Sequence, residues 1–387
     1  MLAVVLSGGG ARGAYEVGVW KALKKLHIKY DIVTGTSIGA INGFMMVQKD
    51  LNKCLKLWRR INYDLLYENF GKVDDSKTMY LAYFNSMIKG GLDTEKIRLI
   101  IDKYYNPRRL YRSKIKYGIV AYNLTTNKAI YATKSDTTAL KLKDYILASA
   151  TCFPIFKATK VENDLLIDGG YCDNFPINLA IDLGAKEVIA VDLGAIGIKR
   201  QVKDKNIDIT YIKPNNKLDS FLMFDSKVTK RMINLGYNDT MKTFNRLEGK
   251  LYTFKKDSLN LYLKYKNRIK DVCETIGYFG DFKDFNSDEK AIKNFQKIVE
   301  NTMEIFKMPV DQIYSFRKLN KFLLKKLNEV ENVNFDKFKL DAIKKILDKA
   351  VITKYIYLKL CHNEPINIIF NFFPKEFSAA IYLYVVR

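Results

Sequence analysis

Short apolar runs that lead directly into glycine-rich turns constrain the fold of this chain more than any other feature. Residues 2–6 are followed by the glycine-rich stretch 7–13, and residues 31–33 by the stretch 35–39. Apolar residues at helical spacing come after each turn, in the second case through Met46. Continuous apolar runs of this length are typical of parallel strands buried on both faces. The succession of strand, glycine loop and helix predicts an α/β fold with a mostly parallel sheet between two helical layers.

Further segments within the first 214 residues fit the same fold class. Residues 50–112 have helical spacing, and so do residues 140–148 and 177–183. Four additional runs have the length and the composition of strands. The predicted strands are residues 116–122, 128–133, 165–167 and 187–192.

The second part of the chain differs in composition. Beyond residue 214 glycine becomes rare, and lysine-rich helical periodicity replaces the strand-like runs. We therefore predict two domains, an α/β domain over residues 1–214 and a mostly helical region over residues 215–387. The second region is expected to act as a lid, a membrane-docking surface or a partner site. After Pro374 the spacing predicts a packed terminal helix rather than one lying on a membrane. Its expected apolar face comprises Phe377, Ala380, Ile381 and Tyr384.

The chain of 387 residues is strongly basic, with 65 Lys and Arg against 42 Asp and Glu and a net charge of +23. The excess is spread over both halves, whereas a nucleic-acid-binding appendage would concentrate it. No nucleic-acid partner is therefore predicted. A diffuse positive field attracts anionic surfaces such as phospholipid headgroups, but it also fits a merely lysine-rich, solvated surface.

The cysteines and the N-terminal residues limit which cellular compartment and which cofactors can be predicted. Five widely spaced cysteines form no C-x-x-C pair, so neither a zinc site nor a disulfide framework is predicted, and no metal or cofactor is expected. The first apolar run is too short for a signal peptide, and no apolar stretch is long enough to span a membrane. We expect a cytoplasmic protein with reduced thiols that can bind peripherally at membranes.

The stretch 35–39 carries the strongest chemical signal, because it matches G-x-S-x-G between a predicted strand and a predicted helix. A serine on such a turn projects its hydroxyl at the edge of the sheet, and the flanking Gly35 and Gly39 let the turn close. The positive end of the following helix favours a developing oxyanion. We therefore predict Ser37 as a nucleophile, with a chance match at a structural turn as the alternative.

The glycine-rich stretch after the first strand supplies candidate hydrogen-bond donors. Successive glycine amides can form a concave anion-binding site. Facing Ser37, the amides of Gly8, Gly9 and Gly10 would form an oxyanion hole, to which we also assign Arg12. The Arg12 side chain would stabilise the loop or bind an anionic headgroup.

The same stretch permits another interpretation. Gly8, Gly10 and Gly13 satisfy the dinucleotide-binding pattern G-x-G-x-x-G, and Asp31 follows at the distance of a ribose-binding acid. A dinucleotide-binding domain has no need of the serine turn that comes directly after Asp31. This alternative is therefore disfavoured.

A third motif, Asp168-Gly169-Gly170, follows the predicted strand at 165–167. An acid at the carboxyl end of a strand lies where α/β sheets carry their chemistry, and Gly169 and Gly170 leave room for a nucleophile. A plain turn after a strand is the alternative. The motif makes Asp168 a candidate base for Ser37.

The choice of base rests partly on the scarcity of histidine. His27 follows the first predicted helix, and His362 lies in the helical second region. The order Ser37, Asp168, His362 keeps a catalytic triad as an alternative. A poorly solvated carboxylate can itself take the serine proton, because burial raises its pKa. We predict Asp168 as the base.

In this order the three motifs resemble the patatin-like phospholipase family over about residues 2–195. The resemblance implies a three-layer α/β/α fold, residues 1–214 as the catalytic domain, and a Ser37–Asp168 dyad with the glycine-loop amides as oxyanion hole. It also implies metal-independent hydrolysis of acyl esters in phospholipids or lysophospholipids. Further residues that agree are Ala40-Ile41-Asn42-Gly43, Ala148-Ser149-Ala150, Pro154, Phe156 and Asn174-Phe175-Pro176.

We therefore expect a lipid acyl hydrolase of the phospholipase A or lysophospholipase type, working through an acyl-serine intermediate at a peripheral membrane surface. Two alternatives stay open. An acyltransferase would pass the acyl group to an alcohol, which the sequence does not distinguish from transfer to water. A non-catalytic membrane-binding protein would keep the site as a relict, and the presence of all three motifs argues against it.

Overall fold

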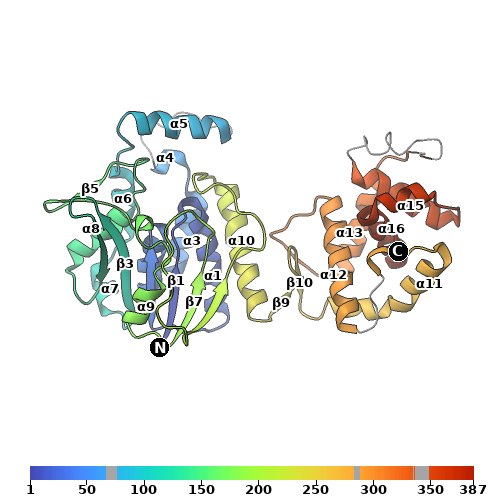
Figure 1. Ribbon diagram of the computed structural model, residues 1–387, viewed down its shortest axis with the longest axis horizontal. Helices are drawn as coiled ribbons and strands as arrows, with labels where there is room; N and C mark the ends of the chain where they lie inside the picture. The colour runs from blue at the N-terminus through green and yellow to red at the C-terminus, as the bar shows by residue number, and fades with distance from the viewer. Residues whose placement is uncertain (67–75, 283–287, 334, 336–347) are drawn as a thin grey trace. The chain divides into compact units, whose positions relative to one another are not determined.

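The computed structural model describes residues 1–66, 76–282, 288–333, 335 and 348–387. The chain forms two compact units, a first unit over Met1–Thr243 and a second unit over Phe244–Arg387 (Figure 1). The functional motifs predicted from the sequence all lie in the first unit.

The first unit is built on a sheet of eight described strands in the order β5-β6-β3-β2-β1-β7-β8, with β4 also paired to β3. Its centre is parallel from β3 through β8, while the pairings of β4 and β6 with β3 and of β5 with β6 are antiparallel. The sheet is therefore mixed, with the expected parallel pairing at its centre and antiparallel pairing at one edge. The strands are β1 (Leu2–Leu6), β2 (Ile32–Thr36), β3 (Lys116–Asn123), β4 (Lys128–Thr133), β5 (Thr159–Val161), β6 (Asp164–Asp168), β7 (Glu187–Val191) and β8 (Asp208–Ile212).

Helices cover both faces of this sheet, which confirms the expected α/β layering. On one face α9 packs against Ala3, Val5 and Ile32. On the other face α2 lies on β2 and β3, where the Tyr117 hydroxyl donates a 2.6 Å hydrogen bond to the carbonyl of Ala40. The helices are α1 (Gly13–Lys25), α2 (Ile38–Val47), α3 (Leu51–Arg60), α4 (Tyr63–Leu66), α5 (Ser76–Ile88), α6 (Glu95–Tyr104), α7 (Pro107–Arg112), α8 (Ala139–Ser149), α9 (Ile177–Asp182) and α10 (Ser226–Thr243), with short 3₁₀ turns η1 (Gly10–Arg12) and η2 (Gly169–Tyr171).

The segment predicted to be helical over residues 50–112 contains α3 to α7, and its residues 67–75 lie outside the described part of the chain. Strand β8 was not predicted. It pairs only with β7 and stays partly exposed, so it lacks the continuous apolar run that marks β1 and β7.

The first unit extends beyond the boundary predicted after residue 214, because α10 packs along α1. The two helices cross closely at glycines: a Cβ on Gly18 would lie 2.0 Å from the carbonyl oxygen of Ile233, and one on Gly236 would lie 2.0 Å from that of Tyr15. The buried Tyr15 hydroxyl also donates a 2.9 Å hydrogen bond to Asp239. These long-range contacts make α10 part of the first unit.

The second unit is mostly helical, as expected, with one small sheet in the order β11-β10-β9. Its apolar core gathers side chains from all of its longer helices. The elements are β9 (Leu247–Glu248), β10 (Thr253–Lys255), η3 (Leu259–Lys264), α11 (Lys266–Ile276), η4 (Gly280–Phe282), α12 (Asp288–Ile305), β11 (Ile313–Tyr314), α13 (Phe316–Glu329), α15 (Lys349–His362), η5 (Ile368–Phe372) and α16 (Pro374–Val386).

The terminal helix α16 lies within the core of the second unit, which confirms the packed alternative. Phe377, Ala380 and Ile381 are buried as predicted, whereas Tyr384 is partly exposed. Burial is not limited to one face, since Tyr382 and Leu383 are fully buried as well. Of the described helices, none combines the length and the apolar character needed to cross a membrane.

Candidate active site

Ser37 lies at the tight turn between β2 and α2, as the motif predicts. Its backbone has φ 56° and ψ −126°, a left-handed conformation that is unusual for a residue with a side chain. The turn closes only because Gly39 has no side chain: a Cβ there would lie 2.6 Å from the carbonyl oxygen of Leu6, at the end of β1. The serine is therefore held at the carboxyl edge of the parallel strands, at the N-terminus of α2.

Two hydrogen bonds fix this turn against neighbouring segments. The amide of Ser37 donates to the Ser149 hydroxyl at 2.9 Å, and the Thr36 hydroxyl donates to the carbonyl of Asp173 at 2.8 Å. Ser149 is fully buried at the end of α8. These contacts leave the Ser37 side chain partly exposed while its backbone is anchored on two sides.

Asp168 is the last residue of β6 and is 5% exposed. Its pairing with Ala121 of β3 brings it to the same edge of the sheet as Ser37. Burial raises the pKa of Asp168 to about 6, and hydrogen bonds from the Ser37 hydroxyl and the Gly170 amide act in the opposite direction. The Gly170 amide lies 2.7 Å from the carboxylate. Asp168 thus combines contact with Ser37 and a basicity above that of an ordinary aspartate.

In the glycine loop between β1 and α1, some backbone amides donate hydrogen bonds within the protein and others do not. The Gly8 amide donates to the carbonyl of Asn174 at 3.1 Å, and the Ala11 amide donates to the carbonyl of Phe221 at 2.7 Å. The amides of Gly9 and Gly10 have no acceptor among the described residues, as expected at the start of the short helix η1. Of the predicted donors, the structure leaves these two for a ligand.

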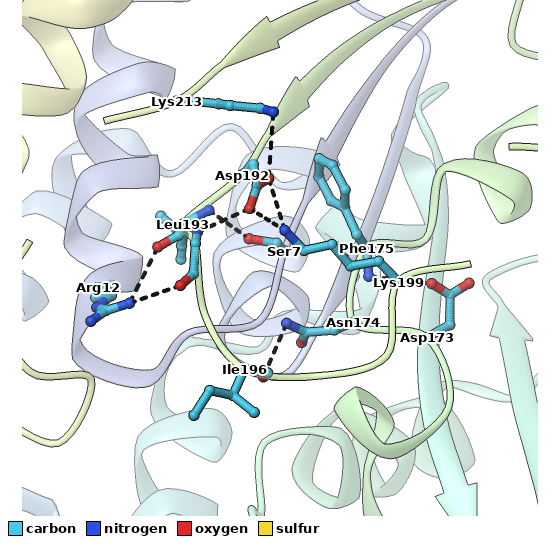
Figure 2. Close-up of polar contacts among 11 residues, drawn as sticks. Ser7, Arg12, Asp173, Asn174, Phe175, Asp192, Leu193, Ile196, Lys199 and Lys213 are labelled. Atoms are coloured by element: carbon cyan, nitrogen blue, oxygen red, sulfur yellow. Dashed lines mark hydrogen bonds and ion pairs between the residues drawn. The ribbon is translucent and has the colours of Figure 1, made fainter. Parts of the chain in front are cut away.

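Arg12 connects the glycine loop to other loops through hydrogen bonds (Figure 2). Its guanidinium donates to the carbonyls of Leu193 and Gly194 at 3.4 and 3.2 Å and to that of Asp219 at 2.9 Å. All three acceptors are backbone oxygens. Arg12 therefore stabilises the loop, which is one of the roles predicted for it. It does not line the cavity described below, so the structure does not bring it to the predicted oxyanion hole.

The loop that follows β7 is held beside the glycine loop by a second set of polar contacts (Figure 2). The Leu193 amide donates to the Ser7 hydroxyl at 3.0 Å, and Lys199 pairs with Asp192 at 2.8 Å. Burial alone would raise the pKa of Asp192, but Lys199 and the Gly194 amide bring it below its usual range. The charged pair anchors the two ends of a loop that carries Ile196 and Ile198.

A cavity of about 550 Å³ opens beside Ser37 and Asp168. Among the described residues that line it, Asp168 is the single carboxylate, and most of the others are aliphatic or aromatic. Gly9, Gly10 and Ser37 line it together with Asp168. Such a cavity fits an apolar chain whose polar end lies at the carboxylate. Its apolar walls include Ile38, Ile41, Leu57, Trp58, Ile61, Leu66, Ile97, Ile100, Ile155, Phe156, Ile196, Ile198, Phe221, Leu222 and Phe224.

Neither histidine lines this cavity. His27 follows the far end of α1, a helix of 13 residues that begins at the glycine loop and therefore spans about 20 Å. His362 is the last residue of α15 in the second unit. Asp31 is equally remote, since its carboxylate accepts a 3.0 Å hydrogen bond from Leu2, at the opposite end of β1 from the glycine loop. The described residues contain no group of three or more His, Cys, Asp or Glu arranged to hold a metal ion.

Sequence reasoning missed most of the cavity wall. The wall comes from α3, α6, the loop after β7 and the segment before α10. Segment 219–222 in particular contacts the glycine loop through Phe221 and Asp219. None of these stretches carries a motif, and their apolar residues are indistinguishable in sequence from ordinary core residues.

Comparisons with known proteins agree with this geometry. The family model "Patatin-like phospholipase" matches residues 4–181. Over 210 residues the chain is 32% identical to the patatin-like phospholipase domain-containing protein ZK370.4 of Caenorhabditis elegans, and over 205 residues it is 29% identical to lysophospholipase nte1 of Aspergillus terreus. Each match covers 50% of this chain, and the chain spans only 14% and 12% of the length of those relatives.

A solved structure of VipD from Legionella pneumophila is similar over 99% of this chain and 91% of its own, with 14% identity. Its TM-score of 0.41 is too low to support any conclusion about this protein. The family match rests instead on the region that contains β1, the glycine loop, the serine turn, Asp168 and the start of α9. Residues 4–181, within the first unit, thus form a patatin-like phospholipase domain.

Proposed function

We propose that this protein hydrolyses carboxylic esters of phospholipids or lysophospholipids, with Ser37 as nucleophile and Asp168 as base. The observation that carries the proposal is that Ser37, Asp168 and the free amides of Gly9 and Gly10 line one largely apolar cavity. The names of the relatives support the same class of substrate.

In the proposed reaction Asp168 takes the proton of the Ser37 hydroxyl as its oxygen attacks the ester carbonyl carbon. The amides of Gly9 and Gly10 donate hydrogen bonds to the oxyanion of the tetrahedral intermediate, and the N-terminus of α2 adds a favourable dipole. Collapse of the intermediate expels the alcohol, which receives the proton from Asp168. Water then attacks the acyl-serine while Asp168 takes a proton from it. Collapse of the second tetrahedral intermediate releases the fatty acid, and Asp168 returns the proton to the Ser37 oxygen.

The cavity composition favours a lipid over a small polar ester. An acyl chain would lie against the aliphatic wall, while the headgroup would stay outside, because Asp168 is the single carboxylate among the described lining residues and no basic side chain lines the cavity with it. A peripheral position at a membrane surface would give such a site access to its substrate.

Labelling with a fluorophosphonate tests the nucleophile. We expect the wild-type protein to be labelled at Ser37, and Ser37→Ala to lose both the label and the release of fatty acid from lipid extracts, measured by mass spectrometry. The reduction in rate should be about a thousandfold or more. Unlabelled wild-type protein with a normal unfolding transition would refute the proposal. Esters formed with added glycerol instead of free fatty acid would make the protein an acyltransferase.

A further inference from the structure

One face of α5 exposes large apolar side chains directly beside the catalytic cavity. Tyr80, Leu81, Phe84 and Ile88 are 51%, 53%, 58% and 70% exposed, and Met87 is 36% exposed. At 100° per residue these five positions fall within an arc of about 120°. We name them the α5 face. Exposed patches of this kind mark surfaces that bind protein or membrane.

The opposite side of α5 is fastened to the first unit. Met79 and Tyr83 are buried, and the Tyr83 hydroxyl donates to the carbonyl of Leu222 at 3.3 Å. The hydroxyls of Tyr80 and Ser220 are 3.1 Å apart. Because residues 219–222 also bind the glycine loop, α5 is linked through one short segment to the loop that offers the free amides.

The α5 face is continuous with the cavity that contains Ser37. A groove along the helix is lined by Tyr80, Leu81 and Phe84, and it shares Ile155 and Leu222 with the catalytic cavity. An apolar chain can therefore pass from the surface at α5 to Ser37 without leaving an apolar wall.

The mouth of the cavity is also apolar away from α5. Ile196 and Ile198, on the loop after β7, line the cavity and are 95% and 55% exposed. A second, separate segment thus presents aliphatic side chains to solvent at the opening through which substrate must enter.

The charged side chains of α5 and of the turn after it are basic, while Asp74 and Asp75 precede this stretch in the sequence and Asp93 follows it. From Ser76 to Leu92 the charged side chains are Lys77 and Lys89, one at each end of the helix, and no acid occurs between them. The whole chain carries a net charge of +23. An apolar helical face flanked by lysines is typical of helices that lie in the interface of anionic membranes.

We propose that the α5 face is the surface by which this protein docks on a bilayer containing anionic phospholipid, so that the ester-bearing lipid enters the cavity along the groove. The inference rests on the proposed lipid hydrolysis, and it adds the surface and the headgroup charge. The occupant is a bilayer rather than a protein because the groove ends at Ser37, where a lipid ester would react.

Vesicle sedimentation with the full-length protein tests the proposal, in a Ser37→Ala background that keeps the vesicles intact. The vesicles contain phosphatidylcholine with or without about 30% phosphatidylserine. The test variant is Leu81→Gln with Ile88→Gln. The matched control is Leu124→Gln with Leu140→Gln, whose side chains are 40% and 73% exposed and do not line the cavity or the groove.

We expect the parent and the control to partition onto anionic vesicles about equally, and the α5 variant to bind at least about tenfold more weakly. Vesicles of phosphatidylcholine alone should bind the parent more weakly than anionic vesicles. Equal binding of the α5 variant and the control, or binding that ignores phosphatidylserine, would overturn the proposal. Failure of the parent to bind any vesicle would also overturn it and would leave a protein partner as the occupant.

Hydrolysis of a soluble short-chain ester separates this proposal from the proposed function. With Ser37 restored, the α5 variant should hydrolyse the soluble ester within about twofold of wild type while losing most activity on anionic vesicles. If wild type hydrolyses no ester at all, the proposed function fails. If both substrates are cleaved normally by the α5 variant, only the docking surface fails.

Discussion

The two units of this protein differ in whether their structure leaves polar groups beside an open cavity. The first unit places a strained serine, a buried aspartate and free amides at the ends of strands, beside an open cavity. The second unit closes its helices around an apolar core in which α16 is buried on nearly all sides. Its three glycines, Gly249, Gly277 and Gly280, lie outside its described α-helices.

This difference indicates where chemistry can reside. Unsatisfied donors and a carboxylate of raised pKa are costly, and a fold keeps them only where the surrounding structure holds them in place. In the first unit that support comes from close backbone approaches at glycine and from hydrogen bonds between distant loops. We therefore place the proposed catalysis in the first unit, and three experiments test this assignment.

We expect the strongest effect from removing the carboxylate of Asp168, the proposed base. Asp168→Asn keeps the size of the side chain but cannot take a proton, so kcat/KM for a soluble ester should fall about a thousandfold or more. His362→Asn, in the second unit, should change it less than twofold. Both are measured by steady-state kinetics, with thermal unfolding as the check on folding. An inactive His362→Asn variant together with an active Asp168→Asn variant would identify His362, in the second unit, as the base.

The pH dependence should show a smaller but diagnostic effect. Because burial raises the pKa of Asp168 to about 6 and the base must be ionised, kcat/KM should be constant above that pH and fall about tenfold per pH unit below it. The profile is best recorded in a variant with His27→Asn and His362→Asn, since the chain has only two histidines. Loss of the break near pH 6 in that variant would assign it to a histidine instead.

The smallest effect should be confined to the second unit. The buried Tyr382 hydroxyl donates a 2.6 Å hydrogen bond to Asn320, so Tyr382→Phe leaves that amide oxygen unpaired and should destabilise the unit by about 1–2 kcal/mol. Urea unfolding measures this change. Tyr384→Phe is the control, because the Tyr384 hydroxyl has no partner among the described residues. Ester hydrolysis at low temperature should be unaffected, and a loss there would show that the two units are coupled.

Local sequence patterns were sufficient to predict the strands and turns that carry the motifs. The runs at Leu2–Leu6 in β1 and at 188–191 in β7 are continuous and apolar because these strands are covered on both faces. The turn at Ser37 was equally predictable, since a left-handed serine beside a close backbone contact demands glycine at specific neighbours.

Features that depend on distant contacts were not predictable. The Gly8 amide is engaged only because Asn174 lies beside it, and nothing within the glycine loop distinguishes Gly8 from Gly9 or Gly10. The extent of the first unit depends on the crossing of α1 and α10, more than 200 residues apart in the chain. The α5 face went unrecognised because exposed and buried apolar residues look alike in a helical pattern.

The pairing of β1 with β7 has a consequence for how this protein can be divided. The family match ends at residue 181, before β7, yet every residue of β1 pairs with a residue between Glu187 and Val191. A fragment cut at the end of the family model would expose one whole edge of the strand that leads into the glycine loop, and would invite aggregation there. The end of the family model is therefore not a boundary at which the folded unit can be cut.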